Sequence, residues 1–227
     1  MPRRLALASG LACVLVLGSA ALPACVLELD EGITVELMAT FDAASGASAD
    51  GAALRLDEAR LHVEDAQLVP CVPELDARVL EALGPSRVFA HHAVGDPLAA
   101  SAPHVIALGA GDSLGAMRPP AGRYCALRVT VTPSAELDDD ALVARGTWER
   151  GGARGTLELR APGQRQLDLS LEPPLAVDAS TLATSVELVV DLPGALGAHS
   201  VVDRDPFDLG LDVMVDLGAA LRARVLR

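Results

Sequence analysis

The chain has 227 residues, and its 31 acidic residues outnumber its 18 basic ones, so the formal net charge is −13 at pH 7. This charge argues against nucleic-acid binding, which needs a basic patch, and against adhesion to anionic lipid without a covalent anchor. The length suffices for one large or two small domains with a buried core.

Residues 1–24 have the organisation of a secretion signal. Arg3 and Arg4 form a short positive region, and apolar or small residues then run from Leu5 to Leu22. A transmembrane anchor is the alternative, but no basic stop-transfer cluster follows the apolar stretch. We therefore expect cleavage and export.

The signal ends in a motif that points to lipid attachment. Leu22, Pro23, Ala24 and Cys25 resemble the bacterial lipobox, in which the cysteine receives a diacylglycerol through a thioether. Pro23 departs from the small residues favoured there, and ordinary cleavage after Ala21 is the competing hypothesis. The resemblance predicts lipidation at Cys25, and two or three acyl chains would anchor the protein stably.

The lipobox resemblance also implies a location in the cell. Val26 follows the cysteine where an aspartate would retain the protein, so sorting to the outer membrane is expected. The predicted lipoprotein faces the periplasm or the cell surface. Its expected partners are the membrane, through the acyl chains, and another envelope protein. No nucleic acid is expected to bind.

Beyond a short tether at residues 25–32, period-two alternation dominates and predicts one β-sandwich domain over residues 33–227. The first strand places these residues on one face: Ile33, Val35, Leu37, Ala39 and Phe41. Gly46–Ala52 is predicted to be a loop by composition. In the following strand, the apolar phase slips between Leu56 and Ala59, which predicts a β-bulge near Asp57 and Glu58.

The clearest strand begins after Pro119, Pro120 and Gly122, which form a turn. Its predicted apolar face carries Cys125, Leu127, Val129 and Val131. Further strands are predicted at Leu157–Leu159, Leu167–Leu171, Val186–Val190 and Leu211–Val215, and short helices near Glu74–Leu83 and Ala219–Leu226. The acidic stretch Glu136–Leu142 is predicted to be a solvated loop. Many strands with Pro/Gly turns favour an all-β fold, an antiparallel β-sandwich of Greek-key or transthyretin-like type.

Removal of the signal would leave two cysteines besides Cys25, namely Cys71 and Cys125. Two thiols in an oxidising compartment usually pair, so we predict a structural disulfide between them. A metal-binding or redox pair is the alternative, but no CxxC spacing or neighbouring histidine set supports it.

One short string resembles an enzyme motif. Gly111, Asp112, Ser113 and Leu114 match the Gly-Asp-Ser-Leu block of the GDSL esterase and lipase family, in which the serine is the nucleophile. The chain contains no asparagine and no Asp-x-x-His sequence, so the family's other blocks are missing. We interpret the string as a loop between strands and expect no catalytic residues.

The histidines offer a second candidate chemistry. His91 or His92, together with His104 and Met117, would suit copper by ligand softness, although their spacing does not demand a site. His62 is predicted to lie on a solvated strand face, and His199 is isolated. We therefore expect no metal ligands and no cofactor. Metal binding is the alternative function.

Two segments resemble secreted bacterial lipoprotein β-sandwiches. Residues 59–71 resemble a strand of MbnP-like domains, and residues 117–133 resemble a strand in a lipoprotein family of unknown function. The positions carried over resemble scaffold residues: Arg60, Val63, Asp65, Leu68 and Val69. The MbnP-like resemblance implies a sandwich fold and, for some members, copper handling through histidines and a tryptophan. The sequence as a whole predicts an exported, lipid-anchored, non-catalytic binding or assembly module, with a GDSL-type esterase as the distant alternative.

Overall fold

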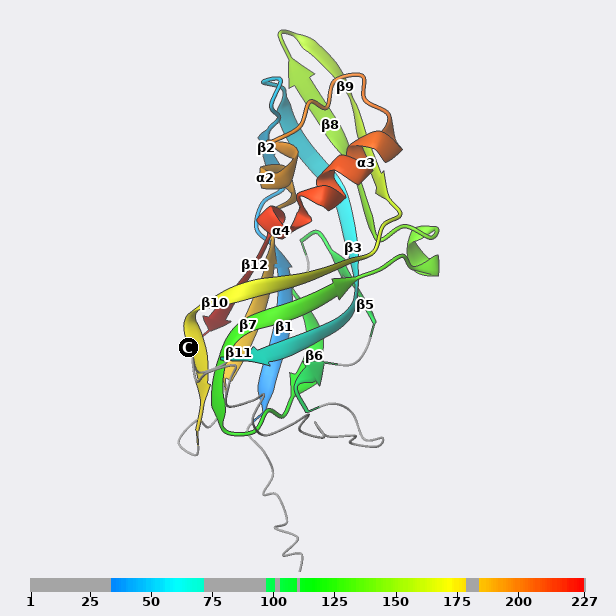
Figure 1. Ribbon diagram of the computed structural model, residues 1–227. Helices are drawn as coiled ribbons and strands as arrows, with labels where there is room; N and C mark the ends of the chain where they lie inside the picture. Colours follow the sequence, from blue (N-terminus) through cyan, green and yellow to red (C-terminus); the bar gives the residue numbers. More distant parts are fainter. Residues whose placement is uncertain (1–33, 72–96, 101–102, 110, 179–183, 227) are drawn as a thin grey trace, which may run out of the picture. The chain divides into compact units, whose positions relative to one another are not determined.

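Strands make up most of the chain in the computed structural model, which describes residues 34–71, 97–100, 103–109, 111–178 and 184–226 (Figure 1). The strands are β1 Val35–Phe41, β2 Ser45–Ala47, β3 Ala53–Pro70, β4 Ala99–Ala100, β5 His104–Ala107, β6 Asp112–Met117, β7 Gly122–Val131, β8 Leu142–Arg150, β9 Ala153–Ala161, β10 Arg165–Val177, β11 Thr184–Val190 and β12 Leu221–Leu226. The helices are the 3₁₀ helix η1 Ala135–Leu137, α2 Leu192–Leu196, α3 Pro206–Val215 and α4 Leu217–Ala220. The predicted all-β class is confirmed.

The described strands form one curled sheet. Its order is β6-β1-β11-β12-β10-β7-β3-β8-β9, and β2, β4 and β5 pair with β3 beside this path. Most neighbours are antiparallel, as expected, but β1 pairs with β11 and β10 pairs with β12 in parallel. The antiparallel expectation therefore holds for most pairs of strands and fails for these two, because long crossovers bring strands together that are far apart in the sequence.

Side chains from both halves of the curled sheet fill one core. Its largest fully buried members include Leu37, Leu61, Leu68, Ile106, Met117, Leu127, Leu142, Leu159, Leu171 and Leu188. These residues come from most of the long strands, and the helices add buried side chains such as Leu196, Leu209 and Leu217 to the same core. All described residues belong to the compact unit Glu31–Arg227.

The predicted bulge in β3 is confirmed. The pairing of β3 with β8 shifts between Leu56 and Glu58, where the apolar phase of the sequence slips. Gly146 lies opposite Leu56, and a Cβ there would lie 2.0 Å from the backbone oxygen of Arg55. The two backbones therefore approach each other at the bulge as only glycine allows.

The predicted apolar face of β7 is right for three residues and wrong for the fourth. Leu127, Val129 and Val131 are buried, but Cys125 is exposed and Tyr124 is buried instead. The register shows the reason, since Ala126 pairs with Val69 and Tyr124 pairs with Pro70, which leaves Cys125 as an extra residue. A bulge thus turns the cysteine away from the core.

The C-terminal region differs most from the prediction. The residues predicted as a strand at Leu211–Val215 belong to helix α3, and the predicted helix at Ala219–Leu226 is largely strand β12. The side chain of Asp205 caps α3 by accepting hydrogen bonds from the backbone N–H groups of Phe207 and Asp208, and Pro206 occupies the first turn. These start signals favour a helix, and burial of Leu209 and Val213 on β9 favours it further.

Three predicted strands, one predicted loop and one predicted helix come next in the comparison. The strands at Leu157–Leu159, Leu167–Leu171 and Val186–Val190 are confirmed within β9, β10 and β11. Gly46–Ala52 begins within β2 rather than as a loop, and then turns into β3. The predicted helix near Glu74–Leu83 lies outside the described residues, as do the signal, Cys25 and the tether.

The acidic stretch Glu136–Leu142 is more ordered than a solvated loop. Leu137 ends the 3₁₀ helix η1 with a buried side chain, and Asp140 is only 2% exposed. Asp140 accepts a hydrogen bond from the Arg160 guanidinium at 2.6 Å. The prediction of a solvated stretch holds for Glu136, Asp138 and Asp139, which are exposed. It fails for Asp140, because a partner strand supplies the charge that allows this carboxylate to be buried.

Candidate interaction surface

Helix α3 lies directly on strand β9 (Figure 1). Leu209, Val213 and Met214 are buried on the side that faces the sheet. Gly210 lies so close that a Cβ would be 1.9 Å from the Arg160 backbone oxygen. The inner side of α3 therefore packs against the sheet. Because Gly210 has no side chain, the helix backbone can lie very close to the backbone of β9.

The outer side of α3 is apolar where a helix on the surface is usually polar. Phe207 is 46% exposed, Leu211 is 51% exposed and Val215 is 67% exposed. Residues four apart are neighbours on a helix surface, so these three side chains form one stripe. Among the described residues, Leu226 is the one other large hydrophobic side chain with this degree of exposure. We call the row of Phe207, Leu211 and Val215 the α3 stripe.

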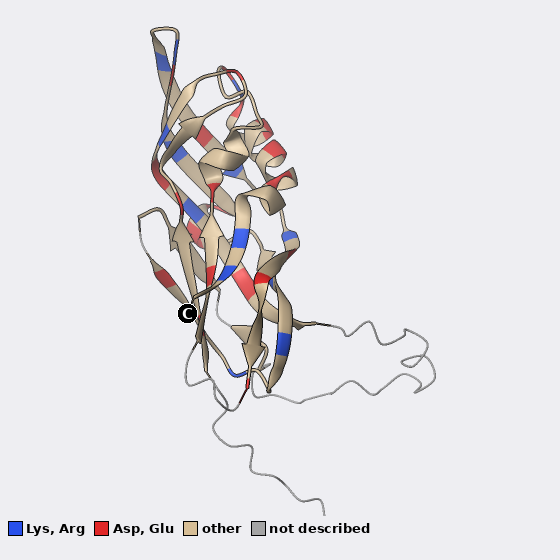
Figure 2. Ribbon diagram, turned by 90° about the vertical axis from the view of Figure 1, so that its left-hand side faces the viewer, with Lys and Arg blue, Asp and Glu red and all other residues tan. Residues whose placement is uncertain are grey.

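A row of carboxylates runs beside the α3 stripe. Asp208, Asp212 and Asp216 follow the three apolar residues by one position each, so they repeat with the same spacing. An Arg204 guanidinium nitrogen lies 2.7 Å from an Asp212 oxygen, and His199 Nε2 lies 3.2 Å from an Asp216 oxygen. Figure 2 marks the acidic positions on the helices in red. We call these three aspartates the acidic row.

Arg160 lies beside the α3 stripe, next to Phe207. Its guanidinium carbon lies 5.2 Å from the centroid of the Phe207 ring, within cation–π distance. The hydrogen bond and charge of Asp140 raise the pKa of Arg160 above its usual value, so the guanidinium stays charged. The adjacent cavity, lined in part by Arg160 and Asp138, measures about 30 Å³, which is room for about one water molecule. The cavity is too small for a ligand.

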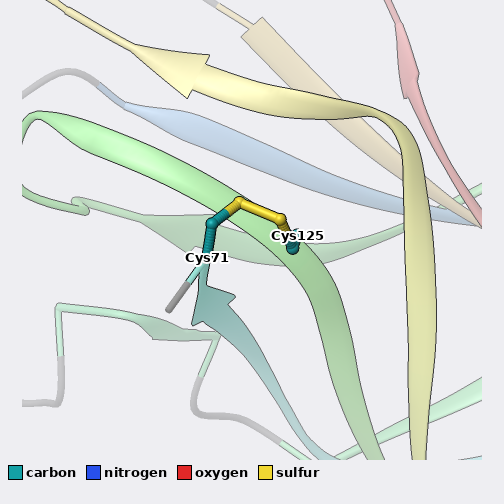
Figure 3. The surroundings of a disulfide bond; sticks show 2 residues. All are labelled: Cys71 and Cys125. Carbon is teal, nitrogen blue, oxygen red and sulfur yellow. A yellow bond between two sulfur atoms is a disulfide. The ribbon is translucent and has the colours of Figure 1, made fainter. Parts of the chain in front are cut away.

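The predicted disulfide between Cys71 and Cys125 is confirmed (Figure 3). Cys71 directly follows β3, and its N–H donates to the Arg123 backbone oxygen at 2.8 Å. The bulge at Cys125 places the two Cα atoms 4.8 Å apart. The covalent bond therefore ties the end of β3 to β7, on the surface rather than in the core.

Ser113, the serine of the GDSL-like string, is an exposed residue of an edge strand. Ser113 lies on β6 and pairs with Met38 of β1, so the GDSL string contains a strand and not only a loop. The neighbouring Asp112 carboxylate accepts a hydrogen bond from the Ala107 backbone N–H at 3.1 Å. Asp112 thus braces the turn between β5 and β6.

The described histidines form no common site, although His62 and His104 lie on the paired strands β3 and β5. His62 is 8% exposed, and its Nδ1 donates to the Thr132 backbone oxygen at 2.8 Å, so the prediction of a solvated face is wrong. A second register shift in β3, between Val63 and Asp65, explains why neighbouring residues of both phases are buried there. His104 lies on β5, whereas His91 and His92 lie outside the described residues. Within the described ranges, no cluster of three or more His, Cys, Asp or Glu could hold a metal ion.

The single tryptophan is part of the sheet. Trp148 of β8 pairs with Gly155 of β9, and a Cβ on Gly155 would lie 2.5 Å from the indole ring. The ring therefore covers the glycine, which is a common way of completing a strand surface. This position agrees with a structural role for Trp148.

The α3 stripe was missed by the sequence analysis because Leu211, Val213 and Val215 also alternate as in a strand. Two signals could have revealed it: the pair Asp205 and Pro206, which is typical of a helix start, and the four-residue spacing of Phe207, Leu211 and Val215. Comparisons of the chain with protein-family models, with curated proteins and with solved structures find no match. A search of the described residues for helices long and apolar enough to cross a membrane finds none.

Proposed function

We propose that the chain is an exported, lipid-anchored protein of the bacterial outer membrane that works as a non-catalytic binding or assembly module. Residues 1–24 are the signal, Cys25 is the lipidated residue, and residues 25–32 tether a domain of residues 33–227. We further propose that the curled sheet is a β-sandwich. The lipobox-like residues before Cys25 support the anchor, and the α3 stripe supports the binding role.

The α3 stripe is the observation that carries the binding role. Its three side chains add nothing to the core, because the opposite side of α3 provides the contacts with β9. Burying such a row against a partner would be favourable, since each large apolar side chain contributes about 1.5–3 kcal/mol when fully removed from water. Exposed apolar rows with a polar border are typical of protein interaction sites.

A site-specific photo-crosslinker in living bacteria tests this role. We expect a crosslinking residue in place of Leu211 to capture one identifiable envelope protein, because the side chain lies at the centre of the stripe. The same residue in place of Leu226, exposed on β12, is the matched control and should not capture that protein. A Val215→Asp substitution should abolish the capture. Equal capture at both positions, or none at position 211, contradicts the binding role.

The anchor is tested separately. Intact-mass analysis of the protein extracted from membranes should show an N-terminal Cys25 with added acyl mass, and Cys25→Ser should release the protein from the outer membrane. An unacylated N-terminus at any other residue rules out lipidation. No arrangement of the described residues favours the copper or esterase alternatives, so neither is proposed.

A further inference from the structure

We infer that the partner of the α3 stripe is a basic amphipathic protein segment, in which apolar side chains are flanked by lysine or arginine. This inference rests on the proposed binding role and adds the chemistry of the partner. It follows from the charges that surround the stripe.

Helix α3 and the short segment that precedes it are strongly acidic. Between residues 203 and 216 there are five aspartates, Asp203, Asp205, Asp208, Asp212 and Asp216, and one basic residue, Arg204. Arg204 is already paired with Asp212. The Asp208 carboxylate, by contrast, forms no ion pair within the described part of the chain. It borders the stripe, because it follows Phe207 by one residue and precedes Leu211 by three. Arg160, on the other flank of the stripe, is already paired with Asp140. Arg165 donates to the Met214 backbone oxygen, so it adds one positive charge near the end of α3. The aspartates still outnumber the arginines, and a partner that covers the stripe therefore lies against a surface with excess negative charge.

This charge disfavours the two other occupants. A second copy of the chain, packed stripe to stripe, would bring two acidic rows together, and the chain carries a net charge of −13. A bilayer surface carries anionic lipids, and helices that lie in it normally present a basic rather than an acidic polar face. Complementary charge favours a basic protein segment, because like charges across an interface are costly.

The dimensions agree with a short segment. Phe207 and Val215 are eight residues apart, which corresponds to about 12 Å along a helix. Two or three apolar side chains of a partner can cover this length, with basic residues along one side facing Asp208, Asp212 and Asp216. Apolar contact supplies the affinity, and the acidic row selects the partner and its orientation.

Binding of three synthetic amphipathic peptides tests the inference. They share one leucine face and differ in the polar face, which carries lysine, serine or glutamate. The protein purified from membranes is placed in phosphatidylcholine nanodiscs, with empty nanodiscs as the blank, or is used in buffer if it carries no acyl chain. We expect the lysine peptide to bind at least about tenfold more tightly than the serine peptide, and the glutamate peptide not to bind.

A charge-adding variant separates docking on the stripe from general attraction. Leu211→Asp makes the protein more acidic, so purely electrostatic binding would become stronger. Docking on the stripe should instead weaken about tenfold or more, because one apolar contact is lost. Leu226→Asp adds the same charge elsewhere on the surface and should leave binding unchanged. Asp208→Asn should weaken the lysine peptide several-fold and leave the serine peptide unaffected.

Several results would overturn the inference. These are no binding of the lysine peptide, equal binding of the serine peptide, or undiminished binding to Leu211→Asp. A concentration-dependent dimer that Leu211→Asp abolishes would assign the stripe to a second copy, and stripe-dependent binding to phosphatidylglycerol vesicles would assign it to a membrane. If the crosslinked envelope protein instead meets the stripe through an acidic or uncharged segment, the binding role stands and the basic partner is rejected.

Discussion

Asp50 joins two segments that are far apart in the sequence. It accepts hydrogen bonds from the Ser48 hydroxyl and from the Ser200 hydroxyl, the latter at 2.7 Å, and from the Val202 backbone N–H at 3.3 Å. These bonds, led by that of Ser48, hold the pKa of Asp50 well below its usual value. The charged carboxylate therefore fastens the turn before β3 to the loop before α3.

This residue predicts acid sensitivity. The pKa of Asp50 is lower in the folded chain than in the unfolded one, so its contribution to stability is present above about pH 4 and is lost as the pH falls below that value. The pKa of Glu187 is also lowered, chiefly by Arg224 and further by Thr40, and acts in the same direction. We expect the urea midpoint of unfolding to fall as the pH is lowered from about 5 to about 2.

Two variants check the assignment. Asp50→Asn should reduce both the stability at neutral pH and the slope with pH. Asp57→Asn is the control, because that carboxylate is 58% exposed and lies 3.6 Å from Arg55. If Asp50→Asn keeps the full pH slope, Asp50 does not cause it.

At the scale of elements, the placement of α3 depends on one close contact. Gly210 allows the helix backbone to lie against the backbone of β9 at Arg160. The α3 stripe faces away from the sheet because the opposite side of α3, with Gly210, packs against β9. The geometry of the proposed binding surface therefore depends on a glycine that is not itself part of it.

Gly210→Ala should displace α3 from β9. The added methyl would meet a backbone oxygen that cannot move independently, so we expect a loss of roughly 2 kcal/mol or more in the free energy of unfolding. Urea unfolding gives this value, and amide hydrogen exchange over residues 206–215 should become faster. Gly218→Ala is the control, since its methyl would lie 3.5 Å from the Leu167 side chain, an ordinary contact. Equal effects of the two substitutions would contradict the close-contact explanation.

At the scale of the whole molecule, the disulfide closes a large loop. Cys71 and Cys125 are 54 residues apart, and the enclosed chain includes β4, β5 and β6. Short strands such as β4 and β5 contribute few hydrogen bonds to β3. The covalent bond therefore limits the freedom of this region in the unfolded chain.

Replacing both cysteines, Cys71→Ser with Cys125→Ser, should lower the free energy of unfolding by up to about 4 kcal/mol, because the unfolded chain gains the entropy of the open loop. The measurement is urea unfolding of both proteins with and without a reductant. Reduction should destabilise the wild-type chain and leave the double variant unchanged. An effect of reductant on the double variant would mean that this disulfide is not what reductant acts on.

Much of the sheet could be predicted from the sequence because alternation is a local property. Residues such as Leu127, Val129 and Val131 must share one side of a strand, whatever the strand pairs with. The bulge near Glu58 was also visible, since a phase slip in the apolar pattern has few other causes. The disulfide followed from the small number of cysteines. Lipidation at Cys25 stays a prediction, because it lies outside the described residues.

Three features became clear only from the folded chain: the direction in which Cys125 faces, the burial of His62 and the helix at Leu211–Val215. Each of these depends on what packs against the residue: an extra residue in the register of β7, a carbonyl oxygen from Thr132, and the backbone of β9 beneath Gly210. The order of residues along the chain was enough to show that the protein is acidic and rich in strands, and export stays a prediction. The α3 stripe arose only in the folded chain, because a pattern that suits both strand and helix is resolved by the surface on which it packs.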